Sequence, residues 1–505
     1  MAAPVHKGQE LELRIDSLAY GGNGVARVGE SGYVVFVKRG LPGDLVKARI
    51  TKVKKGYAEG FRTQLLEGGP QRVEPRCPHF GDCGGCRFQD LEYDAQLAAK
   101  IDQVRESLRR LGGIEDPQLE EALPADHIYG YRNKLEFSFT DTDDGPDLGF
   151  HRAGRWDEVL AITGCHIASE QVNAIRAATR DWARSTGLSV YDQREHTGYL
   201  RHLLIREGRN TNEALVVLVT GPGDLRGREE LIAALSAIES VKGIHWGINE
   251  GQSEITGVPT RKLWGQDWIE EIILGHRYRL RPGAFLQTNT SMAEKLYEVA
   301  LDFADLKGGE TVYDLYCGIG TISLTVAEKA LTVWGIEVVE EAVACALENA
   351  EINGVANAAF FAGNVGVVLE ELKQRAGDPD LVIVDPPRAG LAGRALRRLA
   401  ELQAPRIVYV SCNPTTLAGD LKVLCGEAGY ELKRVKPVDM FPHTPHVECV
   451  ALLELDRERA EANRLAALEA AFTADPAEAT ADDADGSWDA DADPDVDPDA
   501  DPALA

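Results

Sequence analysis

The spacing of apolar residues changes character several times along this 505-residue chain. Between residues 8 and 66, short runs alternate apolar and polar positions and are separated by Gly- and Asn-rich turns, as in Gln9–Ile15, Tyr33–Val37 and Leu45–Val53. Such alternation predicts half-buried β-strands. Several short strands at this spacing predict a small OB-like β-barrel, a fold that often binds single-stranded RNA. A helix is predicted over Asp94–Leu111, where apolar residues recur every three or four positions.

Residues 115–280 mix two kinds of pattern, which predicts an α+β central domain. The strand-like runs are Lys134–Phe139, Leu200–Arg206 and Ala214–Val219, and the helical runs are Ser169–Trp182 and Arg228–Ile238.

Residues 281–455 alternate strictly between strand and helix. Buried strand runs are expected at Thr311–Leu315, Val333–Glu337, Leu381–Val384 and Ile407–Val410. Helices are expected at Leu324–Ala330, Glu340–Asn353, Leu391–Leu402 and Thr415–Ala428. This alternation predicts an α/β fold with a doubly wound, Rossmann-like sheet.

These changes of pattern divide the chain into four parts. We expect an RNA-binding barrel over 1–66, a central domain over 67–280, a Rossmann-like domain over 281–455, and a charged helix with a disordered acidic tail over 456–505. The Ala/Asp/Pro-rich composition of the tail buries too little apolar surface to fold.

The charge distribution refines this division. The formal net charge is −27, but 12 acidic residues and no Lys or Arg lie in 471–505. Local rather than summed charge decides nucleic-acid binding. Residues 34–64 carry a net charge of +6, because two acids face eight basic residues: Lys38, Arg39, Lys47, Arg49, Lys52, Lys54, Lys55 and Arg62. This patch fits either an RNA-binding surface or a solvated face.

The chain contains no run of about 18 apolar residues, which excludes a membrane-spanning helix. Met1–Glu10 lacks the apolar stretch of a secretory signal. Nine cysteines without an export signal are typical of the reducing cytosol. We therefore expect a cytoplasmic protein that has no membrane partner and is a monomer.

A nucleotide-type turn stands at Tyr313–Thr321, where a buried strand ends in Gly318-x-Gly320 and a helix opens. Glycine allows the backbone to approach a ligand closely. Glu337 ends the next strand about 20 residues on, where an acid accepts hydrogen bonds from ribose hydroxyls. The third glycine of a dinucleotide fingerprint is missing, so a generic turn is the alternative.

Two further strands end in chemically useful residues. Asp385 begins Asp-Pro-Pro-Arg at the end of a buried strand, beside the crevice where such sheets bind ligands. Cys412 follows a β-branched run in Ser-Cys-Asn-Pro and is a candidate nucleophile if its pKa is lowered. An ordinary buried cysteine is the alternative.

Four further cysteines suggest a metal site. Cys77, Cys83 and Cys86 lie in a Gly/Pro-rich loop, and Cys165 follows 79 positions after Cys86. Four thiolates suit either zinc or an iron–sulfur cluster.

Five motifs in one order resemble the RNA uracil-5-methyltransferases, and the first 65 residues resemble the TRAM domain of the ribosomal-RNA branch. The motifs are Phe285/Gln287/Asn289, Asp314–Gly320, Asp385–Gly390, Ser411–Pro414 and His443–Glu448. The resemblance implies Cys412 as nucleophile and Glu448 as base. It places six residues around S-adenosylmethionine: Gln287, Tyr316, Thr321, Glu337, Asn364 and Asp385. It also implies a 4Fe–4S cluster on Cys77, Cys83, Cys86 and Cys165, with zinc as the alternative.

The expected activity is therefore methyl transfer from S-adenosylmethionine to C5 of a uridine in ribosomal RNA. The expected substrate is 23S rRNA, with transfer RNA as the alternative. Radical methylthiolation also combines TRAM with an iron–sulfur cluster, but it needs a C-x3-C-x2-C triad, whereas Cys77-x5-Cys83-x2-Cys86 occurs here. A non-catalytic RNA-binding protein is disfavoured because both Cys412 and Glu448 are present.

Overall fold

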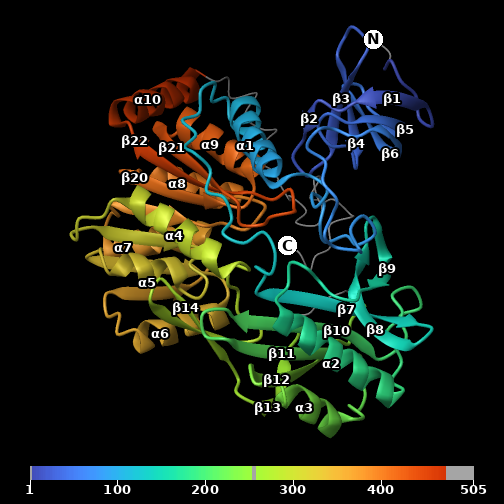
Figure 1. Ribbon diagram of the computed structural model, residues 1–505. Helices are drawn as coiled ribbons and strands as arrows, with labels where there is room; N and C mark the ends of the chain where they lie inside the picture. Colours follow the sequence, from blue (N-terminus) through green and yellow to red (C-terminus); the bar gives the residue numbers. More distant parts are fainter. Residues whose placement is uncertain (1–2, 253–256, 474–505) are drawn as a thin grey trace.

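A computed structural model describes residues 3–252 and 257–473, and it has the α/β character expected (Figure 1). Its strands form four sheets. The first sheet has the order β1-β5-β6-β4-β3-β2, in which only β4 and β6 pair in parallel. Its strands are β1 Glu10–Arg14, β2 Ser17–Leu18, β3 Gly24–Val28, β4 Tyr33–Lys38, β5 Leu45–Val53 and β6 Tyr57–Glu67. We call residues 10–67 the N-terminal β-domain; its alternating apolar residues, such as Val35 and Val46, form a separate core.

The second sheet has the order β13-β12-β11-β10-β7-β8-β9. Its elements are β7 Lys134–Thr142, β8 Gly145–Arg152, β9 Arg155–Ala161, α2 Glu170–Thr186, β10 Leu200–Gly208, β11 Glu213–Thr220, α3 Arg228–Ser236, β12 Val241–Ile248 and β13 Thr260–Gly265. Helices α2 and α3 cover one face, because their apolar residues share a core with alternate residues of β7, β10 and β11. A hairpin of β14 Ile269–Ile273 and β15 His276–Leu280 follows.

The last sheet has the order β18-β17-β16-β19-β20-β22-β21, in which β22 runs antiparallel to its neighbours. Its strands are β16 Thr311–Leu315, β17 Thr332–Glu337, β18 Ala358–Ala362, β19 Leu381–Val384, β20 Arg406–Ser411, β21 Tyr430–Val438 and β22 Glu448–Leu455. Its helices are α4 Thr290–Ala304, α5 Thr321–Ala327, α6 Glu340–Ile352, α7 Val365–Ala376, α8 Gly393–Leu402, α9 Pro414–Gly426 and α10 Arg457–Thr473.

Successive residues of these strands point into different cores, as the pleat requires. Val312 and Ile383 pack with α4, α5 and α6, whereas Tyr313 and Val382 pack with α7, α8 and α9. The first of these cores also contains residues of β11 and the β14–β15 hairpin. The central and C-terminal sheets therefore share one apolar core.

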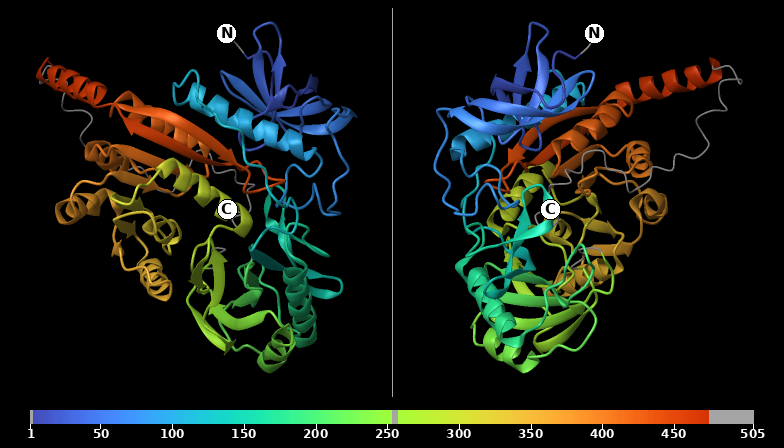
Figure 2. Two further views of the ribbon diagram at one scale, coloured as in Figure 1. Left: turned by 60° about the vertical axis from the view of Figure 1, so that its left-hand side comes forward. Right: turned by 90° about the vertical axis from the view of Figure 1, so that its right-hand side faces the viewer.

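Helix α1 Tyr93–Arg110 crosses from the N-terminal half of the chain onto the C-terminal sheet (Figure 2). Its buried Val104 and Leu108 join the core formed by α7, α8 and α9. A helix that precedes the central sheet in the sequence therefore packs against the C-terminal sheet.

The predicted elements are confirmed with small shifts. Strands β16 and β19 have the expected bounds, whereas α5 begins at Thr321, before the expected Leu324. Strands β21 and β22 and helix α7 were not predicted. Most of the predicted tail, residues 474–505, lies outside the described residues. Within the described part of the chain, no helix has the length and apolar character needed to cross a membrane.

Candidate active site

The functional residues predicted from sequence gather along one edge of the C-terminal sheet. The parallel strands β18, β17, β16, β19 and β20 all end at this edge, and the antiparallel strand β22 begins there. The residues at or just beyond these strand ends are Asn364, Glu337, Tyr316, Asp385 and Cys412, and Glu448 is the first residue of β22.

Cys412 and Glu448 lie on neighbouring strands. Ser411 pairs with Cys449, so the thiol and the carboxyl stand one step beyond that pair. Both interact electrostatically with Asp385, which follows β19. Asp385 in turn interacts with Asp314 at the end of β16, and β19 lies between β16 and β20, so the Ser411–Pro414 segment and the Gly318–Gly320 turn stand at the same edge of the sheet.

Burial dominates the electrostatics of this group. It raises the pKa of the Glu448 carboxyl to about 8, with a further rise from Asp385 and an opposing effect of Arg388. Glu448 is 1% exposed, and its Oε2 has no hydrogen-bond partner among the described residues. A buried carboxyl with a pKa near neutrality is suited to accept and release a proton.

The Cys412 thiol does not have the lowered pKa expected of a resting nucleophile. Burial raises its pKa, and the carboxylates of Glu448 and Asp385 raise it further, while Arg388 opposes them. The thiol is therefore protonated at rest, and forming the thiolate requires neighbouring positive charge or hydrogen-bond donors.

Arg388 is the nearby positive charge. It is exposed at the end of the Asp-Pro-Pro-Arg segment, and its Nη2 lies 2.7 Å from Nδ1 of His446. Burial, followed by the Arg388 charge, holds the pKa of His446 well below its ordinary value. A neutral imidazole accepts the guanidinium hydrogen bond at this nitrogen.

The turn after β16 has the features of a ligand-binding turn. Tyr316 adopts φ 69°, an uncommon value for a non-glycine residue and one that clusters at functional sites. Gly318 has φ 54° and open space where a side chain would begin. The Glu337 carboxylate accepts the backbone N–H groups of Gly318 at 3.1 Å and Val339 at 2.9 Å. It therefore fixes the turn and keeps further lone pairs for a ribose.

The remaining predicted cofactor residues occupy different positions around this edge. The side-chain oxygen of Asn364 accepts a hydrogen bond from the N–H of Gly366 at 3.0 Å, so this oxygen caps the start of α7. Thr321 opens α5 and donates to the Tyr297 hydroxyl at 3.2 Å. Gln287 is buried, and its backbone carbonyl accepts a hydrogen bond from the side chain of Asn133, in the central domain, at 3.0 Å.

Asp314 is buried at this edge. The sequence predicted it only as a member of the Asp314–Gly320 motif and gave it no role of its own. Burial raises its pKa to about 7, and Ser323 donates to its Oδ2 at 2.5 Å. Its Oδ1 has no partner among the described residues. A buried, half-satisfied carboxyl at the cofactor turn is itself a candidate ligand contact.

The segment before Glu448 is held by residues far away in the sequence, which the sequence did not reveal. Lys100 of α1 forms a fully buried ion pair with Asp439 at 2.6 Å and donates to the Phe441 carbonyl at 2.9 Å. The N–H groups of Arg87 and Phe88 both donate to the His443 carbonyl, at 2.8 and 3.0 Å. The segment 439–448 therefore rests on α1 and on the loop that contains Cys86.

The four cysteines predicted as metal ligands come together. Cys77, Cys83, Cys86 and Cys165 all line one small cavity between the cysteine-rich loop and the central sheet. Cys86 interacts electrostatically with the other three thiols. Within the described ranges, however, no three His, Cys, Asp or Glu side chains are arranged to hold a metal ion. The predicted cluster is therefore not shown, although its four predicted thiol ligands line one cavity.

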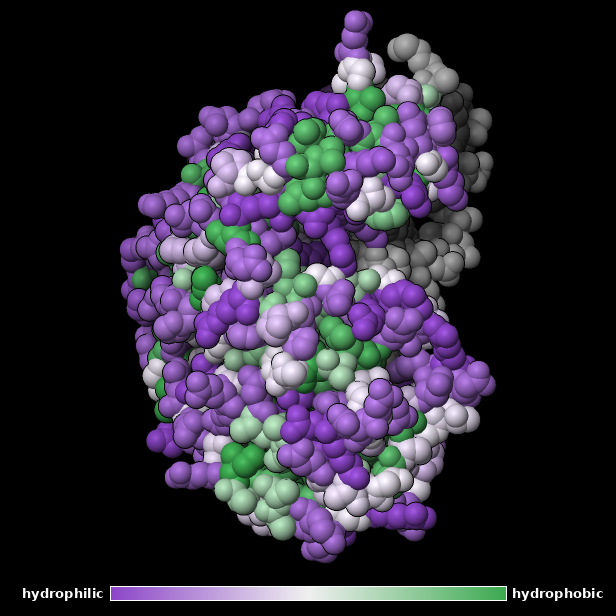
Figure 3. Space-filling view, turned by 45° about the vertical axis from the view of Figure 1, so that its right-hand side comes forward, coloured by the Kyte–Doolittle hydropathy of each residue, from purple (hydrophilic) through white to green (hydrophobic). Residues whose placement is uncertain are grey.

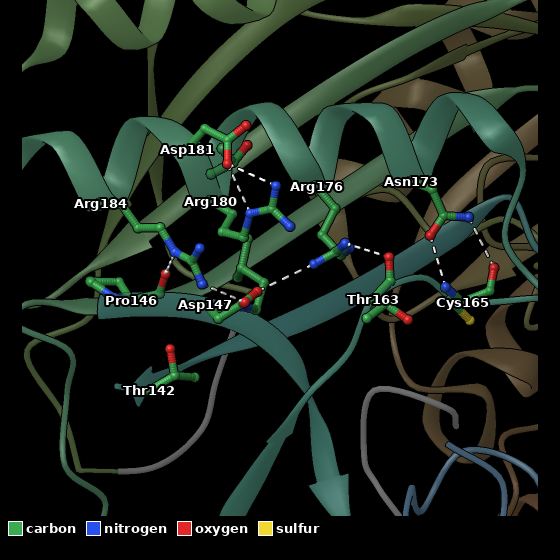
Figure 4. A network of polar contacts seen from close by, with 12 residues as sticks. Thr142, Pro146, Asp147, Thr163, Cys165, Asn173, Arg176, Arg180, Asp181 and Arg184 are labelled. Atoms are coloured by element: carbon green, nitrogen blue, oxygen red, sulfur yellow. Dashed lines mark hydrogen bonds and ion pairs between the residues drawn. The ribbon is translucent and has the colours of Figure 1, made fainter. Parts of the chain in front are cut away.

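Helix α2 fixes the position of Cys165 (Figure 4). Asn173 accepts the N–H of Cys165 at 2.8 Å and donates to its carbonyl at 3.0 Å. Buried Arg176 donates to the Thr163 carbonyl at 2.9 Å, and Asp147 pairs with Arg176 and Arg184. The fourth thiol thus sits on a rigid segment.

A larger cavity of about 950 Å³ lies between the N-terminal β-domain and the cysteine-rich loop. Five basic residues line it: Lys38, Arg39, Arg62, Arg72 and Arg87. The acids Glu59, Glu74 and Asp90 line it as well, and Arg72 forms ion pairs with Asp44 and Asp90. Other members of the predicted basic patch are neutralised, since Lys47 and Arg49 pair with Glu10 and Lys52 pairs with Glu59. The face in Figure 3 is mainly hydrophilic, with small separate apolar patches.

Comparison with known proteins adds independent information. Residues 260–456 match the family described as tRNA (uracil-5-)-methyltransferase, and residues 4–61 match the TRAM domain. An uncharacterized RNA methyltransferase of Halalkalibacterium halodurans is 40% identical over 455 residues, which cover 90% of this chain and 98% of that protein. One from Clostridium tetani is 41% identical, over 88% of this chain and 98% of that protein.

A solved structure agrees over the same length. The tRNA (uracil-54, C5)-methyltransferase of Pyrococcus abyssi, crystallised with S-adenosyl-L-homocysteine, is 31% identical, and the match covers 88% of this chain and 99% of that one with a TM-score of 0.70.

Proposed function

Because the chain belongs to the RNA uracil-5-methyltransferase family, we propose that it methylates C5 of a uridine with S-adenosylmethionine as donor, through a covalent bond between Cys412 and C6. The observation that carries the proposal is that Cys412 and Glu448 stand side by side, one step beyond a pair of register partners, at the edge that carries the glycine turn.

The residues fit the steps that this chemistry needs. Uracil C5 is a poor nucleophile, and addition of the Cys412 thiolate to C6 moves electron density to C5. After C5 has gained the methyl group, the Glu448 carboxylate accepts the C5 proton, and the C–S bond breaks to release Cys412 and restore the ring. When bound, S-adenosylmethionine supplies the electrophilic methyl group. Residues that would hold it are Gln287, Tyr316, Thr321, Glu337, Asn364 and Asp385.

The proposed path of the RNA uses the cavity between the N-terminal β-domain and the cysteine-rich loop. The cavity beside the N-terminal β-domain supplies cations for phosphates. A base that reacts with a buried thiol must leave its stack, at a cost of a few kcal/mol. We therefore place an unstacked uridine at Cys412 and the adjoining strand along the cavity.

We propose ribosomal RNA, including 23S rRNA, as substrate, supported by the TRAM match at residues 4–61. Transfer RNA is the second candidate, favoured by the activity named for the Pyrococcus abyssi enzyme. Mapping 5-methyluridine by mass spectrometry in both RNA classes from a deletion strain separates the two. Loss confined to transfer RNA contradicts the ribosomal assignment.

Cys77, Cys83, Cys86 and Cys165 would hold a 4Fe–4S cluster, with zinc as the alternative, because four thiols line one cavity. Its role would be to tie the cysteine-rich loop, and through it His443, to the central sheet. Iron, sulfide and zinc are measured in anaerobically purified protein and in Cys83→Ser. Cys425→Ser, on α9, is the control. Absence of all three elements from the wild type contradicts the proposal.

Methyl transfer from labelled S-adenosylmethionine to bulk RNA tests the activity. Cys412→Ala should abolish transfer and retain RNA binding, whereas Cys425→Ala should leave both unchanged. If Cys412→Ala still transferred methyl groups, the proposed covalent bond between Cys412 and C6 would be ruled out.

A further inference from the structure

The loop that connects β2 to β3, residues 19–23, lies against the catalytic segment rather than in solvent. At its start, Leu18 belongs to an apolar cluster with Phe88 and Leu91 from the region between the cysteines and α1. Leu41 of the N-terminal β-domain joins the same cluster. Burial of these side chains fixes the base of the loop.

Two contacts fix the tip of the loop. The Arg87 guanidinium donates to the Gly21 carbonyl at 2.7 Å. A Cβ placed on Gly22 would lie 3.1 Å from the Phe88 ring and 3.3 Å from Cβ of Pro445, and Gly22 has φ 84°. Pro445 stands three residues before Glu448, so the backbone of this loop touches the segment that carries the base.

Tyr20 stands between these anchors and is half-buried. It interacts electrostatically with Arg388, Cys412 and Glu448, so its phenol ring lies beside the guanidinium that His446 binds. Burial raises the pKa of Tyr20 to about 12, so its phenol is neutral. A neutral hydroxyl accepts from a guanidinium and keeps its own proton to donate.

Arg388 needs such a partner. It is exposed on a long side chain, and it is the cation that opposes the raised pKa values of Cys412 and Glu448. A guanidinium held in one orientation stabilises a developing thiolate more than one that turns toward solvent. His446 holds it from the C-terminal domain, and Tyr20 holds it from the N-terminal β-domain.

We propose that Tyr20 is a positioning residue for methyl transfer, which holds Arg388 beside Cys412 and Glu448 so that the N-terminal β-domain completes the active site. The inference rests on the proposed function. It gives this domain a part in the chemistry in addition to RNA binding.

The test is Tyr20→Phe, which removes the hydroxyl and keeps the ring. We expect kcat for methyl transfer to fall about tenfold, the cost of one charge-assisted hydrogen bond, with KM for RNA unchanged. Tyr33→Phe is the matched control, because Tyr33 is in the same domain and donates only to the Lys54 carbonyl at 2.6 Å. It should match the wild type.

Wild-type kcat in Tyr20→Phe would overturn the proposal, as would a raised KM with unchanged kcat, which would make Tyr20 a stacking platform for RNA. Melting temperature and S-adenosylmethionine binding are measured on each variant, and Arg388→Met, which removes the charge and the N–H donors, provides a second readout. In the Arg388→Met background, Tyr20→Phe should cost less than twofold, since the guanidinium that Tyr20 would position is gone. Failure of the proposed function is seen separately, as transfer by Cys412→Ala.

Discussion

Cys412 and Glu448 stand one residue beyond Ser411 and Cys449, which are register partners in the antiparallel pair β20–β22. Because β22 reverses direction, the end of β20 and the start of β22 fall at the same edge of the sheet. The antiparallel strand therefore brings together the proposed nucleophile and the proposed base, which lie 36 positions apart in sequence.

Replacing the base should trap the covalent intermediate. In Glu448→Gln the C5 proton has no acceptor, so the bond between Cys412 and C6 persists after methyl transfer. We expect a slowly migrating protein–RNA band on a denaturing gel. The double variant Cys412→Ala/Glu448→Gln should not form it. If Glu448→Gln gives no such band, another group removes the proton.

The rate should rise with pH through the range set by Glu448. Its pKa is raised to about 8 by burial, so the carboxylate needed to accept a proton is the minor form below that pH. The pKa of Cys412 is raised as well, which acts in the same direction. We expect kcat/KM to increase at least tenfold per pH unit below about pH 8 and to rise less steeply above it, where only the thiol remains to be deprotonated. A profile that is flat from pH 6 to 9 would contradict this assignment.

The same shift has the opposite effect on stability. A folded-state pKa above the unfolded value means that Glu448 contributes stability at low pH, and this contribution is lost as pH rises from about 4.5 to about 8. Glu448→Gln should therefore melt at the wild-type temperature near pH 4.5 and about 5 °C higher at pH 8.5. Glu454→Gln, exposed on the same strand, should show no such difference. An equal change in melting temperature at both pH values would indicate that the substitution acts through side-chain packing and not through the charge of Glu448.

Local patterns in the sequence account for the strands that build this edge. Thr311–Leu315 and Leu381–Val384 are short apolar runs bounded by polar segments, and both became buried central strands. Parallel strands place their last residues at one edge, so Tyr316, Asp385 and Cys412 could be expected together.

Contacts between distant segments could not be predicted in this way. Lys100 reads as a polar position on an amphipathic helix, yet it is fully buried against Asp439. Tyr20 reads as part of a glycine-rich turn, yet it reaches Arg388. The raised pKa of Cys412 depends on burial and on two carboxylates from other strands, none of which a local motif specifies.

Glu337 should control binding of S-adenosylmethionine. Its carboxylate oxygens accept the N–H groups of Gly318 and Val339. Glu337→Gln places an NH2 group against one of these donors and removes an acceptor for the ribose. We expect affinity to fall about 10- to 100-fold by calorimetry. Glu340→Gln, exposed at the start of α6, is the control. Unchanged affinity would place the ribose elsewhere.

The cavity beside the N-terminal β-domain should dominate the salt dependence of RNA binding. Lys38 and Arg39 line it, whereas Lys54 and Lys55 do not. Each phosphate contact on a single strand contributes about 0.7 to the slope of log K against log salt. Lys38→Ala/Arg39→Ala should therefore reduce the slope by about 1.4, and Lys54→Ala/Lys55→Ala, which removes the same charge from the exposed β5–β6 turn, should leave it nearly unchanged. Fluorescence anisotropy at several salt concentrations measures both. If the slope fell more in the Lys54/Lys55 variant, the RNA would have to bind at the β5–β6 turn and not along the cavity.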